Sequence, residues 1–132
     1  MPYIKIQEKT KSNEDGCEKL LEYSKSAKNS FIFANLVDFD VYFGHRNDPE
    51  GFHEALVEFD INLPDILSEM DSTDRIIITA DHGNDPTSES TDHSREYVPL
   101  LYYYPGMETK SLGIRETFAD VGKTIAHFFN VE

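Results

Sequence analysis

Five side chains that could bind a metal ion lie in three polar segments of the chain: Asp40, His45, Asp81, His82 and His93. Carboxylate and imidazole ligands without a thiolate suit manganese, iron or zinc better than calcium. Two such ions, about 3.5–4 Å apart, can clamp a phosphoryl group during in-line transfer. The spacing alone leaves a second interpretation open, in which the aspartates cap turns and the histidines lie on loop surfaces.

Two apolar runs precede these polar segments and are expected to position them. "FIFANLV" (31–37) is almost continuously apolar, which predicts a strand covered on both faces, as in a parallel sheet. "RIIIT" (75–79) predicts a second buried strand. Polar residues just beyond the carboxyl ends of strands form the sites of α/β sheets. Asp40 and Asp81 come at these two ends.

The remaining pattern predicts helices and further strands around this pair. Ser12 or Asn13 should cap a helix with Cys17 on its apolar side, and a second helix should start near Pro49. Pro64 should kink or split that second helix. The other predicted elements are a short strand at 3–7, a strand at 97–104, and a final helix within 115–129 that turns Phe118, Val121, Ile125, Phe128 and Phe129 inward. The chain is therefore predicted to be one α/β domain, residues 1–132, with a mostly parallel sheet flanked by helices.

The composition restricts the partners and the compartment. Twelve basic residues against 25 acidic residues give a net charge of −13, which argues against nucleic acid and anionic membranes as partners. The single cysteine excludes an internal disulfide and suits a reduced, cytoplasmic setting. No apolar run is long enough to predict a membrane span.

Four stretches carry a specific resemblance: "LVDFDVYFGHRNDPEGF", "ITADHGNDPT", "TDHSREYVPLL" and "SLGIRETFADVGKTIAHFF". In this order and spacing they resemble the carboxyl-terminal part of phosphopentomutases, which are metalloenzymes of the alkaline phosphatase superfamily. Cofactor-independent phosphoglycerate mutases are relatives. The resemblance runs from about Lys9 to near the end of the chain, and it implies a partial alkaline-phosphatase-like core.

The resemblance also implies roles for the five side chains. Asp40, His45 and His93 match the family's ligands to one manganese ion, and Asp81 and His82 match ligands to the other. The family interconverts the 1-phosphates and 5-phosphates of ribose and deoxyribose through a phosphorylated threonine and a bisphosphate. Pentose phosphate is therefore the substrate expected for the complete enzyme.

Two parts of the family pattern have no match in this chain. The nucleophilic threonine and one metal-binding aspartate belong to an amino-terminal segment that this sequence does not contain, and the cap domain is also absent. Thr79, Thr87, Thr91 and Ser94 are expected to be turn and loop hydroxyls. We therefore expect no catalytic nucleophile here, one occupied or weak manganese site, and no mutase turnover by the isolated chain.

Several alternatives stay open at this point. Arg95 could bind phosphate, or it could form a local ion pair with Glu96 or Asp92. The chain could be a non-catalytic metal-binding or partner-dependent piece, or part of another superfamily member such as a phosphatase or phosphoglycerate mutase. Missing strands would leave sheet edges uncovered, so self-association is also expected.

Overall fold

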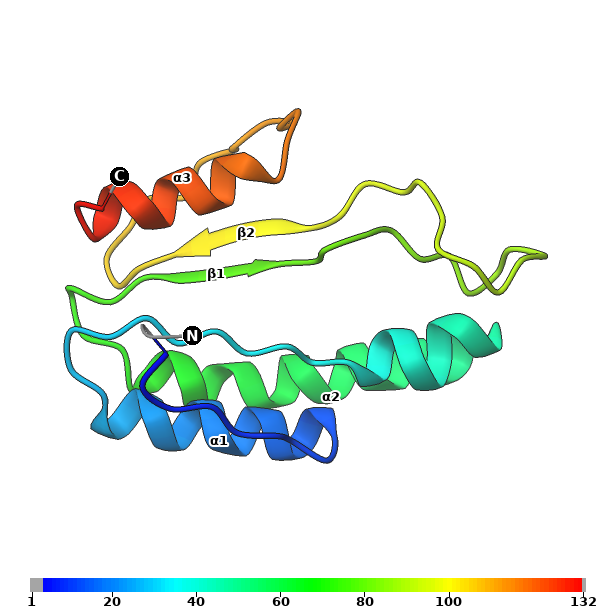
Figure 1. The fold of residues 1–132 in the computed structure, drawn as a ribbon, viewed down its shortest axis with the longest axis horizontal. Coiled ribbons are helices and arrows are strands. Elements are labelled where there is room, and N and C mark those ends of the chain that lie inside the picture. The colour runs from blue at the N-terminus through cyan, green and yellow to red at the C-terminus, as the bar shows by residue number, and fades with distance from the viewer. Residues whose placement is uncertain (1–3, 132) are drawn as a thin grey trace.

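The computed structural model describes residues 4–131 as three helices and a two-stranded sheet (Figure 1). The helices are α1 (Asn13–Ser26), α2 (Pro49–Ser68) and α3 (Ala119–Phe128), and the strands are β1 (Ile76–Thr79) and β2 (Leu100–Tyr103). A π-helical turn, Phe39–Phe43, and a 3-10 turn, Gly44–Arg46, lead into α2. Helices combined with a small sheet agree with the predicted partial α/β core.

Helix α1 begins where the sequence predicts. The Ser12 side chain accepts a hydrogen bond from the Asp15 N–H at 3.2 Å, and Glu14 and Asp15 place negative charge in the first turn. Both features favour a helix start, because they satisfy a free N–H and complement the helix dipole. The local sequence therefore defines this end of the helix.

The small core lies mainly between α1 and α2, which pack against each other. Cys17 on α1 and Ala55 and Ile66 on α2 are the buried hydrophobic residues of the described chain. Pro64 does not split α2, contrary to one predicted outcome, because the helix continues from Pro49 to Ser68. Packing of the apolar face against α1 offsets the backbone hydrogen bond that a proline removes.

The described strands pair in an antiparallel sheet, which corrects the expectation of a mostly parallel one. Ile76 lies opposite Tyr103, and Thr79 lies opposite Leu100. Antiparallel strands need no crossover helix, and the polar loop 80–99 joins these two directly. Both predicted strands exist here, and the sheet that they form is antiparallel.

The run 31–37 is extended without being a strand, and this is a second correction. It runs in the same direction as β1 (Figure 1), yet residues 31–36 make no backbone–backbone hydrogen bond within the described part of the chain. A strand requires a partner for its N–H and C=O groups. The same applies to residues 4–7, which are not a strand; residue 3 of that predicted strand lies outside the described residues.

Helix α3 is shorter and less covered than predicted. It begins at Ala119, so residues 115–118 are not helical. Phe118 and Phe128 are 57% and 49% exposed, and Phe129 is 36% exposed, whereas Val121 and Ile125 are partly buried. The predicted inward positions of the three phenylalanines were wrong, because the described chain offers too little surface to cover them. Among the described residues, no helix is long and apolar enough to cross a membrane.

Candidate metal centre

Asp40 and His45 are presented by the π-helical turn and the 3-10 turn that follows it. The Gly44 N–H bonds to the carbonyls of both Phe39 and Asp40. In an α-helix, residues five positions apart point about 140° away from each other. The wider π-turn, with its i to i+5 hydrogen bond, brings such residues toward one side. Asp40 and His45 can therefore face the same point.

A reciprocal pair of hydrogen bonds fixes this turn to the start of α1. The Asn13 N–H donates to Asp38 Oδ2 at 2.7 Å, and the Asp38 N–H donates to Asn13 Oδ1 at 3.0 Å. Asn13 is only 8% exposed. The Asp38 carboxylate also lies at the positive end of the α1 dipole, which stabilises the negative charge. The amino end of α1 thus positions the segment that carries Asp40.

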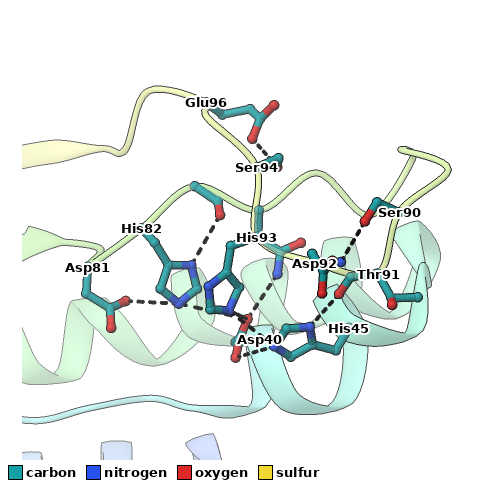
Figure 2. A network of polar contacts seen from close by, with 12 residues as sticks. Asp40, His45, Asp81, His82, Ser90, Thr91, Asp92, His93, Ser94 and Glu96 are labelled. Atoms are coloured by element: carbon teal, nitrogen blue, oxygen red, sulfur yellow. Dashed lines mark hydrogen bonds and ion pairs between the residues drawn. The ribbon is translucent and has the colours of Figure 1, made fainter.

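Three predicted ligands meet in one cluster (Figure 2). Asp40, His45 and His93 offer ligand atoms that all lie within 4.8 Å of one another. Asp40 Oδ2 is 3.4 Å from His45 Nε2, and Asp40 Oδ1 is 3.4 Å from His93 Nε2. The two Nε2 atoms are 3.2 Å apart. One carboxylate and two imidazoles from separate segments therefore converge on a single volume.

The backbone determines which nitrogen of His45 is free. His45 Nδ1 lies 2.5 Å from the carbonyl oxygen of Thr91. A carbonyl oxygen can only accept, so Nδ1 carries the proton and Nε2 of the neutral ring has a free lone pair. That lone pair faces His93 Nε2, which donates a hydrogen bond to it in the Nε2-protonated tautomer and could share a cation with it in the other tautomer. This arrangement is typical of histidines that bind metals through one nitrogen and a backbone carbonyl through the other.

His82 and Asp81 stand beside this cluster. The His82 ring stacks on the His93 ring, with centroids 3.6 Å apart and an 18° angle between the planes. His82 Nε2 is 4.0 Å from Asp40 Oδ1 and 3.6 Å from Asp81 Oδ1. The Asp81 side chain is 85% exposed. The structure therefore brings all five predicted residues to one region, with Asp81 at its solvent edge (Figure 2).

Two asparagines that the sequence analysis did not single out also contact this region. Asn84 Nδ2 donates to Asp40 Oδ1 at 3.0 Å, and Asn47 Nδ2 donates to the Ser88 carbonyl at 2.8 Å. Asn84 lies within the quoted stretch "ITADHGNDPT", two residues after His82. Its position was a signal, but an amide binds manganese, iron or zinc less readily than a carboxylate or an imidazole does, so the metal search did not select it.

Comparison with known proteins identifies the family. The model of the metalloenzyme superfamily matches residues 2–132. The chain belongs to the metalloenzyme superfamily. Membership agrees with the geometry, because the members of this superfamily are metalloenzymes and the described chain brings a carboxylate and two imidazoles together.

Curated relatives to which the chain is more than half identical are phosphopentomutases. The chain is 57% identical over 122 residues to the enzyme of Dictyoglomus thermophilum, covering 92% of this chain and 31% of the relative. It is 56% identical over 127 residues to that of Kosmotoga olearia, covering 94% and 32%. For Clostridium kluyveri the identity is 52% over 123 residues, covering 92% and 32%. The chain, a member of the superfamily, thus aligns with about a third of the length of each of these relatives.

The donor set fits the metal that the superfamily name implies. The carboxylate and the two imidazoles supply three ligand atoms, and the backbone bond at His45 leaves its Nε2 available. Neutral imidazole and carboxylate are ligands common to manganese, iron and zinc. The geometry therefore supports a divalent transition metal of this group.

Other predicted residues have simpler surroundings. Arg95 is exposed and forms no ion pair with Asp92 or Glu96; the Glu96 carboxylate instead accepts a hydrogen bond from the Ser94 hydroxyl. The Thr87 hydroxyl bonds Asp85 within the loop, which agrees with its prediction as a loop hydroxyl. That bond from Thr87 holds the pKa of the Asp85 carboxyl below its ordinary value. His53 and His127 are exposed on helices.

Proposed function

We propose that this chain is the metal-binding portion of a phosphopentomutase core. The observation that carries the proposal is the convergence of Asp40, His45 and His93, in a chain more than half identical to phosphopentomutases. The complete enzyme would interconvert the 1-phosphates and 5-phosphates of ribose and deoxyribose. We infer the pentose phosphate substrate from the resemblance to phosphopentomutases. The substrate belongs to the complete enzyme, because this chain spans about a third of the length of those relatives.

Asp40, His45 and His93 would hold one manganese ion. Asp81 and His82 would contribute to a second ion in the complete enzyme, and they offer too few ligands for one here. A bound divalent ion would supply Lewis-acid stabilisation of the charge on a transferring phosphoryl group. This chain's residues would bind that ion and orient it. The nucleophilic threonine would belong to the amino-terminal segment of the complete enzyme, along with the remaining aspartate.

Arg95 would bind the phosphate of the substrate. It lies two residues after His93, it is exposed, and neither neighbouring carboxylate pairs with it. A guanidinium can donate two parallel hydrogen bonds to a phosphoryl group. We also place the protein in the cytoplasm, where the single thiol of Cys17 would stay reduced.

A manganese titration of the purified chain tests the metal site. We expect the wild-type chain to bind about one Mn²⁺ per molecule, as measured by calorimetry or electron paramagnetic resonance. His45→Ala removes a ligand nitrogen and should weaken binding at least about 10-fold. His127→Ala, an exposed histidine on α3, is the matched control and should bind like wild type.

Equal affinity in wild type and His45→Ala would remove this ligand assignment. Activity gives a second test, since the isolated chain should not convert ribose 1-phosphate to ribose 5-phosphate. Measurable conversion by the 132-residue chain would show that the proposed division of roles is wrong.

A second candidate is a partner-dependent piece without activity of its own. It is favoured by residues 31–36, whose backbone groups lack backbone partners in the described chain, and by the exposed Phe31 and Phe33. The test mixes this chain with the complementary two-thirds of the Kosmotoga olearia relative and measures the mass of the mixture by light scattering. A stable one-to-one complex supports this candidate, whereas two independent species would exclude it.

A further inference from the structure

Hydrogen bonds join the loop that carries His93 to the segment that carries Asp40 at regular intervals. Asn84 donates to Asp40, Asn47 donates to the Ser88 carbonyl, and His45 donates to the Thr91 carbonyl. The loop positions are thus spaced three or four residues apart between residues 84 and 91. Two of the three bonds come from amide side chains that lie outside the three-ligand set.

Asn84 is fitted closely against the π-helical turn. A Cβ added to Gly44 would lie 2.7 Å from Asn84 Cγ, so the absence of a side chain at Gly44 makes room for the amide. Gly44 has a φ of −62°, so its backbone does not require glycine. The requirement is space for Asn84, whose donor reaches Asp40 Oδ1 at 3.0 Å. That bond restrains the carboxylate whose other oxygen lies 3.4 Å from His45 Nε2.

Asn47 restrains the middle of the loop from the other side. Its backbone is left-handed, with a φ of 51°, a conformation that asparagine adopts more easily than most residues. It ends the 3-10 turn that carries His45, and its amide donates to Ser88 at 2.8 Å. Its Oδ1 is buried without a hydrogen-bond partner in the described chain. The side chain therefore acts here through its donor.

We propose that Asn84 and Asn47 are positioning residues that assemble the three-ligand site before a metal ion binds. Asn84 holds the Asp40 carboxylate, and Asn47 holds the loop that carries His93 over His45. This inference rests on the proposed metal site. A preformed site does not have to order its loop during binding, so its ligands bind the ion more tightly.

Two variants remove these donors with little other change. Asn84→Ala deletes the bond to Asp40, and Asn47→Gly deletes the bond to Ser88 while it keeps a residue suited to the left-handed backbone. Each should weaken Mn²⁺ binding about 10-fold or more, in the range measured for residues that orient metal ligands. Thr87→Ala, which breaks only a bond within the same loop, should bind like wild type.

A second measurement needs no metal. Amide hydrogen exchange in the metal-free chain should be faster for residues 83–94 in both asparagine variants than in wild type and Thr87→Ala. The proposal requires both results. Unchanged affinity overturns it, and so does unchanged exchange, because the loop would then not depend on these amides.

The two measurements separate this proposal from the proposed metal site. If wild type and His45→Ala bind manganese equally weakly, the metal site itself is wrong. The positioning proposal then falls with it, because the two amides would have no metal site to assemble. If wild type binds well but the asparagine variants bind equally well, only the positioning role is wrong.

Discussion

At the scale of single residues, Cys17 gives a direct test of the small core. Its side chain is 4% exposed between α1 and α2, and burial raises the pKa of its thiol. The thiolate is the reactive form, so the native thiol should react slowly with a disulfide reagent at pH 8. We expect the rate to rise at least about 10-fold when urea unfolds the chain, because the pKa then returns to its ordinary range. A native rate equal to the unfolded rate would mean that this core is not formed.

Residue chemistry also explains which site residues the sequence could predict. Asp40, His45 and His93 were predicted because carboxylates and imidazoles bind metals wherever they are brought together. Asn84 and Asn47 were missed because an amide acquires its role only from the partner that the fold places beside it. Asp81 lies in the same region, with a side chain that is 85% exposed and outside the three-ligand set, so its predicted role as a ligand stays a prediction.

At the scale of elements, a small polar network attaches the segment before α1 to that helix. Glu8 accepts a hydrogen bond from the Tyr23 hydroxyl at 2.9 Å and pairs with Lys19 at 3.2 Å. The hydrogen bond from Tyr23, followed by that from Lys19, lowers the pKa of Glu8. The same bond to Glu8 raises the pKa of Tyr23. The attachment should therefore respond to pH.

The sign of this response follows from the lowered pKa of Glu8. Its contribution to stability is present above the ordinary carboxyl pKa of 4.5 and is lost as the pH falls below that value, through the lowered one. We expect amide exchange in residues 5–11, corrected for intrinsic pH dependence, to become less protected across that window. Glu8→Ala should remove the pH dependence and also lower the pKa of Tyr23, which an ultraviolet titration measures. A Tyr23 titration that does not change in Glu8→Ala would contradict the network.

The elements also show where local sequence is sufficient. Helices α1 and α2 begin at their predicted residues because Ser12 and Asp48 satisfy free N–H groups within the first turn. The strand at 31–37 was wrong because strand formation depends on a partner distant in sequence, and the described chain supplies none. The π-helical turn was missed because nothing in "FDVYF" distinguishes a turn with an i to i+5 hydrogen bond from an α-helical turn with an i to i+4 hydrogen bond.

At the scale of the whole molecule, the chain leaves more of its surface exposed to solvent than a compact protein of its mass would. It exposes 10559 Å², whereas a compact monomer of 15.1 kDa would expose about 7100 Å². Phe33 in the extended run is 79% exposed, beside backbone groups of residues 31–36 that make no backbone–backbone hydrogen bond within residues 4–131. Such an uncovered edge is a site for pairing with other chains.

We therefore expect the chain to self-associate as its concentration rises, as measured by sedimentation velocity. Phe33→Lys should weaken this association several-fold, because charge on an unpaired edge opposes strand pairing. The matched control is Ile61→Lys, which changes a residue 71% exposed on α2, where the helix satisfies its own backbone. If both variants suppress self-association equally, the association is a nonspecific effect of surface hydrophobicity. If the wild-type chain stays monomeric at all concentrations, the edge at residues 31–36 does not mediate self-association.

The π-helical turn also has a consequence for length-changing mutations. The five-residue spacing of Asp40 and His45 suits the π-helical turn, whose hydrogen bond spans one residue more than that of an α-helix. Deleting any residue within 41–43 would favour ordinary α-helical geometry and rotate one side chain away from the other. Substitutions at these positions change surface and packing, whereas single-codon deletions change the angle between two ligands. A library containing both kinds of change should therefore lose its deletions here, even where nearly every amino acid is accepted.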